Sequence, residues 1–361
     1  MTPEDDGVRP DGAPDADARA ADGAPDADAR AADGGPPALP PARPGLSTFT
    51  IEGRAAPGLF VVGWLASILG AGILFIGYQA PRSAIASALI LVGLVLLSVG
   101  LVTAAGSQAI ERRAGGVAPY TGPSPFLLLG ASVAVGSLAA SLIALLILLL
   151  GGDPEGPLVA VILLAVVQAT YIGLTHLLVV GTGALSWAEM GVRGDVRERV
   201  SNLAWGAWFA LPVLGLTMVV VALLSTVVKA VPESPLPATG TTEGLLLNLL
   251  GGAVLVPIGE EVMFRGVATT AWRRVYGPSR AIVQGALFFA VVHILQVVGS
   301  TSDQALGLAL VAFAARVPVA LALGWLFEAR RSIFSSIGLH MAYNAILLVL
   351  AEVVRTSSSS A

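Results

Sequence analysis

The stretch GGAVLVPIGEEVMFRG, residues 251–266, decides how this chain folds. Its first half is apolar, as in a membrane-spanning helix, whereas its second half holds Glu260, Glu261 and Arg265. A charged side chain at the centre of a bilayer costs about 2.5–3.5 kcal/mol on insertion scales. Three such residues in one span are therefore expected to pair, to face a wet cavity or to perform a function.

The composition around this stretch is that of a helical membrane protein. Of the 361 residues, 55% are hydrophobic and only 12% are charged, against about 25% charged residues in an average soluble domain. The apolar residues form blocks of about 18 to 25 residues, the length that crosses a bilayer as a helix. We therefore predict an all-α fold, a polytopic transmembrane helical bundle of about eight or nine spans. The nine candidate spans are 58–79, 83–105, 126–150, 157–181, 203–229, 245–272, 280–298, 304–328 and 332–354.

The composition also predicts three regions along the chain. Residues 1–56 are rich in Ala, Asp, Gly and Pro, and DGAPDADARAA at 11–21 recurs at 22–32. Such a segment buries too little apolar surface to offset its ordering entropy, so we expect a disordered acidic tail. Residues 57–240 are expected to form N-terminal transmembrane helices, and residues 241–355 a core that carries the polar site.

Charged residues in the loops predict the orientation. With the N-terminus in the cytoplasm, the inner loops hold Arg112, Arg113, Arg193, Arg197, Arg199, Arg273, Arg274, Arg280, Arg330 and Arg331. The outer loops and the C-terminal tail hold Arg82, Lys229 and Arg355. Because basic residues accumulate on the cytoplasmic side, we expect an integral membrane protein, of the plasma membrane, with a cytoplasmic N-terminus.

Two later spans carry polar side chains at a depth similar to that of the acids. At 1.5 Å per residue, Glu260, His293 and Asn344 lie about 20 Å from the cytoplasmic end of their helices, and His340 about 14 Å. Glu261 and Arg265 are four residues apart and are expected to pair on one helix face. His340 and Asn344 share this spacing, as do Phe289 and His293, so Phe289 is expected to wall the imidazole. The helices are therefore expected to meet at one site, with Gly266 admitting a close neighbouring helix.

The residue types at this site fit hydrolysis by activated water. A carboxylate in a low-dielectric pocket can take a proton from water, and His and Asn side chains can donate to an oxyanion. A Glu with two His can alternatively hold a divalent metal such as zinc. The chain has no cysteine, no H-E-x-x-H helix and no G-x-S-x-G elbow, which argues against thiol, zincin and serine-elbow chemistry.

The motifs together resemble a known family. Glu260, Glu261, Arg265 and Gly266 form E-E-x-x-x-R-G, followed by F-x-x-x-H at Phe289 and His293 and by H-x-x-x-N at His340 and Asn344. This order resembles the CAAX prenyl protease and bacteriocin-processing family of intramembrane endopeptidases, over about residues 245–350. The resemblance implies that Glu260 activates water, that Glu261 and Arg265 organise the site, and that His293, His340 and Asn344 hold water or the substrate oxygen. Phe264 stands where the family often has Tyr.

The predicted partners are the lipid bilayer and a membrane-associated or peptide substrate, and no basic cluster suggests nucleic acid. These residues do not single out a cofactor, and a divalent metal such as zinc is an open alternative. Two other classes fit the composition: an ion-coupled transporter with an intramembrane Glu/His relay, and a non-catalytic scaffold or immunity protein.

Overall fold

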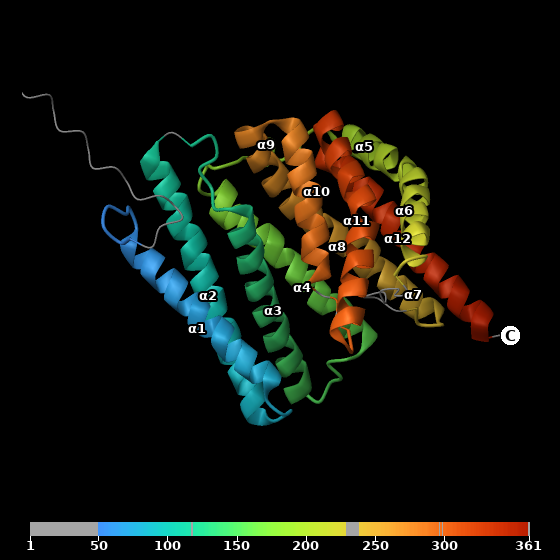
Figure 1. The fold of residues 1–361 in the computed structure, drawn as a ribbon, viewed down its shortest axis with the longest axis horizontal. Coiled ribbons are helices and arrows are strands. Elements are labelled where there is room, and N and C mark those ends of the chain that lie inside the picture. The colour runs from blue at the N-terminus through green and yellow to red at the C-terminus, as the bar shows by residue number, and fades with distance from the viewer. Residues whose placement is uncertain (1–49, 117, 229–237, 296, 298, 360–361) are drawn as a thin grey trace, which may run out of the picture. The chain divides into compact units, whose positions relative to one another are not determined.

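A computed structural model describes residues 50–116, 118–228, 238–295, 297 and 299–359. Residues 1–49 of the predicted acidic tail lie outside this part, as does Lys229 of the orientation argument. The described residues form helices and connecting turns, without strands (Figure 1). The all-α prediction is thus confirmed. The helices are α1 (Pro57–Gln79), α2 (Ala84–Gly115), α3 (Pro125–Leu149), α4 (Pro157–Thr175), α5 (Val196–Trp208), α6 (Ala210–Ser225), α7 (Thr242–Asn248), α8 (Val256–Glu261), α9 (Thr270–Tyr276), α10 (Pro278–Ile294), α11 (Ser302–Arg330) and α12 (Ile333–Ser359).

Eight helical segments in the described residues are long and apolar enough to cross a membrane. The apolar helix α10 is shorter, at 17 residues. Its seventeen residues rise about 25 Å, somewhat less than a typical hydrocarbon core. These segments correspond to the predicted eight or nine spans, and the chain is an integral membrane protein.

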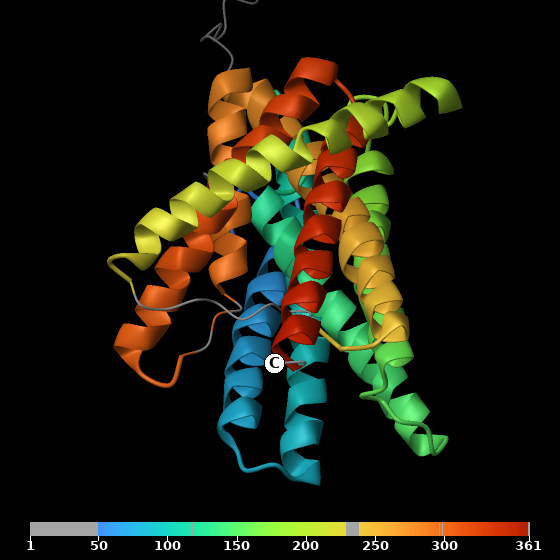
Figure 2. The same cartoon turned by 90° about the vertical axis from the view of Figure 1, so that its right-hand side faces the viewer.

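The charged span is one continuous helical segment from Thr242 to Tyr276. It includes two wider π-helical turns, η2 (Leu249–Leu255) and η3 (Val262–Thr269), between its α-helical parts. Another π-helical turn, η1 (His176–Val180), ends α4. In Figure 1, the α1/α2 hairpin and α3 lie to one side of this segment, and α11 crosses in front of it. Figure 2 shows α12 running beside the charged span, and both helices contribute to the site.

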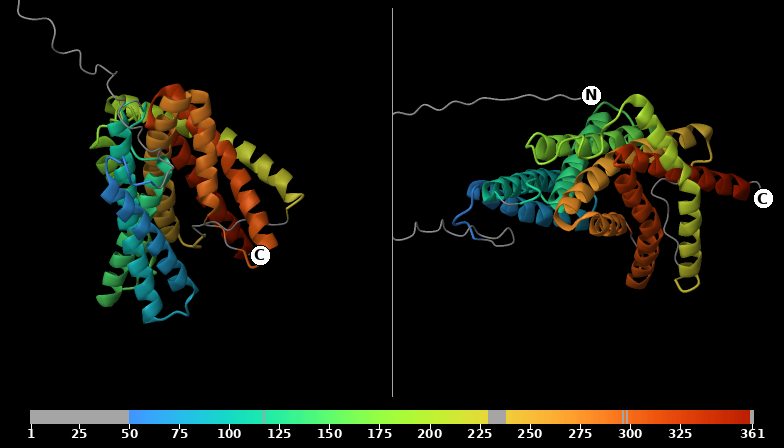
Figure 3. Two further views of the ribbon diagram at one scale, coloured as in Figure 1. Left: turned by 60° about the vertical axis from the view of Figure 1, so that its left-hand side comes forward. Right: turned by 90° about the horizontal axis from the view of Figure 1, so that it is seen from above.

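The fifth predicted span differs from the structure. The helix starts at Val196, because the Asp195 carboxylate accepts from the backbone N–H of Glu198 and caps it. It is interrupted at Phe209, between α5 and α6. Helix α5 crosses α12 very closely: a Cβ added to Gly206 would lie 1.9 Å from the carbonyl oxygen of Ser335. Figure 3 shows α6 continuing from α5 along α11.

Loops that were predicted to lie on one side of the membrane meet at one end of the helices. Arg113 donates to the carbonyl of Thr182, and Arg274 donates to the carbonyl of Ala184. Arg330 donates to the side-chain oxygen of Asn202 at 3.0 Å. These basic loops therefore lie at the same end of the helices, as expected when successive spans cross the membrane in alternating directions. The side of the membrane that this end faces stays a prediction.

Candidate active site

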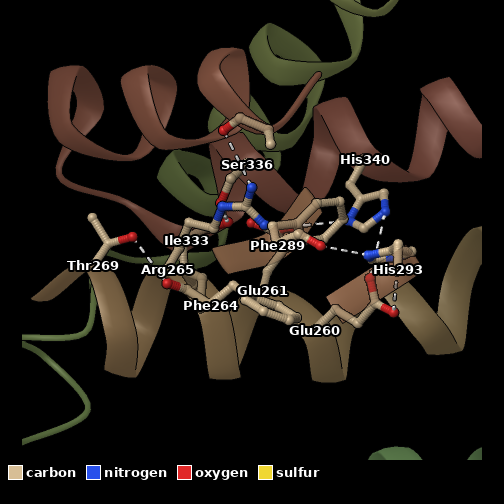
Figure 4. Close-up of polar contacts among 11 residues, drawn as sticks. Glu260, Glu261, Phe264, Arg265, Thr269, Phe289, His293, Ile333, Ser336 and His340 are labelled. Atoms are coloured by element: carbon tan, nitrogen blue, oxygen red, sulfur yellow. Dashed lines mark hydrogen bonds and ion pairs between the residues drawn. The ribbon is translucent and has the colours of Figure 1, made fainter. Parts of the chain in front are cut away.

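The inner part of the site is a sealed network of three ionisable side chains (Figure 4). Arg265 Nη1 donates to Glu261 Oε1 at 2.8 Å, and His340 Nδ1 lies 2.9 Å from the same oxygen. The Glu261 side chain is 0% exposed, and Arg265 and His340 are also buried. Arg265 Nη2 further donates to the carbonyl oxygen of Ala320 on α11 at 3.3 Å. The network therefore ties the charged span to α11 and α12.

The outer part of the site centres on Glu260. Its Oε1 lies 4.0 Å from His293 Nε2, and its Oε2 lies 3.8 Å from His340 Nε2. Both distances exceed a direct hydrogen bond and are of the kind that a water molecule bridges. Among the described residues, Glu260 Oε2 has no hydrogen-bond partner. Glu260 and His293 are each 16% exposed at the side chain, so this part is less enclosed than the inner network.

Hydrogen bonds fix the orientation of the two imidazoles. His293 Nδ1 lies 2.8 Å from the carbonyl oxygen of Phe289. A carbonyl only accepts, so Nδ1 must carry a hydrogen and Nε2 is the nitrogen turned toward Glu260. His340 Nδ1 meets the carboxylate of Glu261, and its Nε2 likewise faces Glu260. Two Nε2 atoms from two helices thus converge on one carboxylate.

Aromatic rings wall the site, as predicted for Phe289. The ring of Phe289 lies 4.3 Å from the His293 ring and 5.7 Å from the His340 ring, between centroids. The Arg265 guanidinium lies 4.7 Å from the same ring. Phe264 packs edge-on against Phe289 at 5.0 Å. These buried rings exclude water from the inner network, which strengthens its electrostatic interactions.

The π-helical turn η3 carries Arg265 and begins directly after the two acids. Its wider turn is visible in side-chain contacts five residues apart: Thr269 Oγ1 donates to the carbonyl oxygen of Phe264 at 2.9 Å, and Thr270 Oγ1 to that of Arg265 at 3.2 Å. Such turns are found frequently at functional sites. This turn was not predicted from the sequence, because the predictions assumed the α-helical period of 3.6 residues per turn.

Helix α4 adds residues that the motif analysis missed. Gln168 is buried against Gly259, the residue before Glu260: a Cβ on Gly259 would lie 2.2 Å from Gln168 Oε1. Gln168 Oε1 has no hydrogen-bond partner among the described residues. Tyr171 and Thr175 are also buried, at the spacing that continues one helix face. Three polar residues on one face of an apolar span are the sequence signal by which this face could have been found.

Five of the six predicted site residues thus lie together: Glu260, Glu261, Arg265, His293 and His340. Asn344 is on the same helix as His340, but its Nδ2 donates to the carbonyl oxygen of Gly252 at 2.9 Å. The catalytic roles of all six stay predictions. The expected close approach at Gly266 is wrong, because a Cβ there would meet only ordinary contacts at 3.5 Å, from Met190 and Ile333.

The arrangement does not fit a metal centre. Within the described residues, no three or more His, Asp or Glu side chains are grouped so that they could hold a metal ion. Glu261 is already engaged by Arg265 and His340, which removes one of the two acids from a possible set of metal ligands. We therefore derive no step through a metal, and the predicted alternative of a zinc-type centre gains no support from this geometry.

Together, the membrane-spanning helices and the buried cluster of acids and imidazoles define an integral membrane protein with an intramembrane polar site. Residues 242–346 match the family model described as Rce1-like, type II CAAX prenyl endopeptidase. This match supports the resemblance to the CAAX prenyl protease and bacteriocin-processing family that the motifs predicted. The match covers α7 to the first half of α12, and at family level it supports a CAAX-protease-like intramembrane endopeptidase. Searches of curated proteins and of solved structures gave no match.

Proposed function

We propose that the chain hydrolyses a peptide bond of a membrane-associated substrate with water activated by Glu260. The observation that carries this proposal is the convergence of two imidazole Nε2 atoms, at 4.0 and 3.8 Å, on the two oxygens of one carboxylate. A water between these groups has a proton acceptor in Glu260 and further polar partners in His293 and His340. This is the arrangement that general-base catalysis requires.

The reaction proceeds in two steps. Glu260 takes a proton from water while the water oxygen forms a bond to the peptide carbonyl carbon, which gives a tetrahedral oxyanion. The C–N bond then breaks, and Glu260 returns the proton to the leaving nitrogen, so that a carboxylic acid and an amine are released. His340 Nε2, when it carries a proton, donates to the oxyanion. Glu261 acts through His340 Nδ1 and holds the ring in position.

Asn344 can offer fewer hydrogen-bonding groups to a substrate than the sequence alone predicts. One N–H of its amide is engaged by the carbonyl oxygen of Gly252. Its remaining N–H and its oxygen are the groups that would meet substrate. This bond joins α12 to η2 and supports a positioning role in addition to oxyanion binding.

The test is a comparison of protein N-termini in membranes that contain the wild-type chain or the Glu260→Gln variant. We expect a set of new N-termini that are present with the wild type and absent with the variant. A transporter or a scaffold would give the same N-termini in both samples, which would refute the proteolytic function. A third sample, treated with a strong zinc chelator, is expected to keep the new N-termini, because no step uses a metal.

A further inference from the structure

Arg316 is a cation at the centre of a membrane span. It lies half-way between Ser302 and Arg330, the ends of α11, about 21 Å from each. A single arginine at this depth is costly unless a partner or a wet cavity compensates for its charge. The residue is partly exposed rather than sealed, unlike Arg265. Its side chain is therefore not fully enclosed by the described helices.

The two intramembrane arginines differ in their partners. Arg265 has a direct ion pair with Glu261 at 2.8 Å. Arg316 takes part in none of the ion pairs between described residues. Its one hydrogen bond among the described residues runs from Nη1 to the carbonyl oxygen of Ala312, one turn back on its own helix, at 3.0 Å. A guanidinium has five N–H donors, so this bond leaves most of its capacity for a ligand.

Arg316 is also close to the groups that would carry out the reaction. Ala320, one turn further along α11, accepts a hydrogen bond from Arg265 of the inner network, so the part of α11 that carries Arg316 adjoins the site. Arg316 and Glu260 do not form an ion pair, because no Arg316 nitrogen lies within 4.0 Å of a Glu260 oxygen. The cation thus lies near the site without an ion pair to its outer carboxylate.

We propose that Arg316 binds a carboxylate of the peptide substrate. This inference rests on the proposed function, since it takes the peptide to occupy the pocket at Glu260. A guanidinium matches a carboxylate through two parallel N–H···O bonds, and such a bidentate pair fixes direction as well as affinity. A substrate carboxylate would supply the missing counter-charge and would place a nearby peptide bond against Glu260. The carboxylate comes from the end of the peptide chain or from an Asp or Glu side chain.

Peptide binding tests this inference without requiring cleavage. The probes are N-acetyl-trileucine as the free acid and as the C-terminal amide, and N-acetyl-Leu-Asp-Leu-amide with its Asn analogue. Affinities are obtained from the rise of the unfolding temperature of the full chain in a non-ionic detergent. For the wild type we expect at least one acid to bind about tenfold or more tighter than its neutral analogue, as expected for a hydrogen bond to a charged group. The probe pair that shows the difference identifies the source of the carboxylate.

Variants assign the effect to Arg316. In Arg316→Gln the acid-to-neutral ratio is expected to fall to about one, whereas Arg316→Lys keeps part of it, because the charge remains without the planar fork. Arg82→Gln, in the exposed turn between α1 and α2, is the matched control and should keep the wild-type ratio. If the wild type binds acids and neutral analogues equally, or binds none of the probes, the inference is overturned. A ratio that persists in Arg316→Gln overturns it as well.

The outcomes separate this inference from the proposed function. Binding that depends on both carboxylate and Arg316, without any Glu260-dependent cleavage, would refute the protease and leave the carboxylate site standing. Cleavage that is lost in Glu260→Gln but is equally fast for acids and neutral analogues would support the protease and refute the carboxylate site. With both correct, Arg316→Gln raises KM for acidic peptides about tenfold and changes kcat less.

Discussion

Glu260 and Glu261 are neighbours in the sequence but occupy opposite environments. Glu261 is 0% exposed, and one of its oxygens is engaged by both Arg265 and His340. Glu260 is 16% exposed, and its oxygens stand 4.0 and 3.8 Å from two imidazoles without a direct hydrogen bond. Successive residues of a helix point about 100° apart, which lets one acid face the packed helices and the other the pocket. In our proposal, the inner acid is a structural residue and the outer acid is the catalytic one.

The largest expected effect is on activity, in the outer part of the site. His293→Ala removes one of the two imidazoles facing Glu260, and we expect cleavage to fall by about 100-fold or more. Stability should change much less than with the inner substitutions, since His293 is partly exposed and has one hydrogen bond. Initial rates on a substrate found by the N-terminal comparison measure the effect. Full activity in a folded His293→Ala variant would remove this residue from the mechanism.

The next effect is on stability, in the inner network. Arg265→Gln leaves Glu261 buried without its cation, and breaking a buried pair in this way costs about 3–5 kcal/mol. Unfolding by denaturant in detergent micelles measures the cost. Arg273→Gln is the control, because Glu328 keeps its second partner, Arg331, in that variant. Equal losses of unfolding free energy in the two variants would show that the buried Glu261–Arg265 pair stabilises the fold no more than the Arg273–Glu328 pair does.

A smaller effect is expected where α4 touches the charged span. Gly259→Ala forces a methyl group against Gln168, with a gap of 2.2 Å to Oε1, and overpacking of this kind costs about 1–3 kcal/mol. Gln168→Ala in the same chain should recover much of the loss. Gly173→Ala on α4, where an added Cβ meets nothing within 4 Å, is the matched control. The measurement is the unfolding temperature of the wild type, of Gly259→Ala, of the double variant and of Gly173→Ala. A Gly259→Ala variant as stable as Gly173→Ala would contradict the close contact.

The smallest effect is expected at the loop surface. The backbone N–H and hydroxyl of Ser186, followed by Arg274, hold the pKa of Glu189 below its ordinary value. A lowered pKa in the folded state stabilises the protein above the unfolded pKa, and this contribution is lost as the pH falls through the folded pKa. Glu189→Gln should therefore lower stability at pH 7 by about 1 kcal/mol or less, and the difference should vanish in acid. A difference that grows in acid would contradict this assignment.

The motifs were sufficient to predict which helices meet. Their spacing predicted the Glu261–Arg265 pair and the Phe289–His293 contact, because both are four-residue relationships within one helix. Similar depth predicted that His293 and His340 approach the acids. These relationships depend on helix periodicity and span length, which a single sequence displays.

Contacts between helices were harder to predict. The partner of Asn344 is the backbone carbonyl of Gly252, which has no side-chain signature in the sequence. The close contacts fall at Gly206 and Gly259 and not at Gly266, because they depend on where whole helices cross. The π-helical turn at Val262–Thr269 likewise has no sequence rule, and the placement of Gln168 against Gly259 depends on how α4 packs.

The most direct test of the division between the two acids is a paired measurement on Glu260→Gln and Glu261→Gln. Each purified variant is assayed for cleavage and for unfolding temperature in the same detergent. Our account predicts that Glu260→Gln loses cleavage and unfolds at about the wild-type temperature, whereas Glu261→Gln loses both cleavage and stability. Cleavage by Glu260→Gln, or equal destabilisation of the two variants, would contradict it.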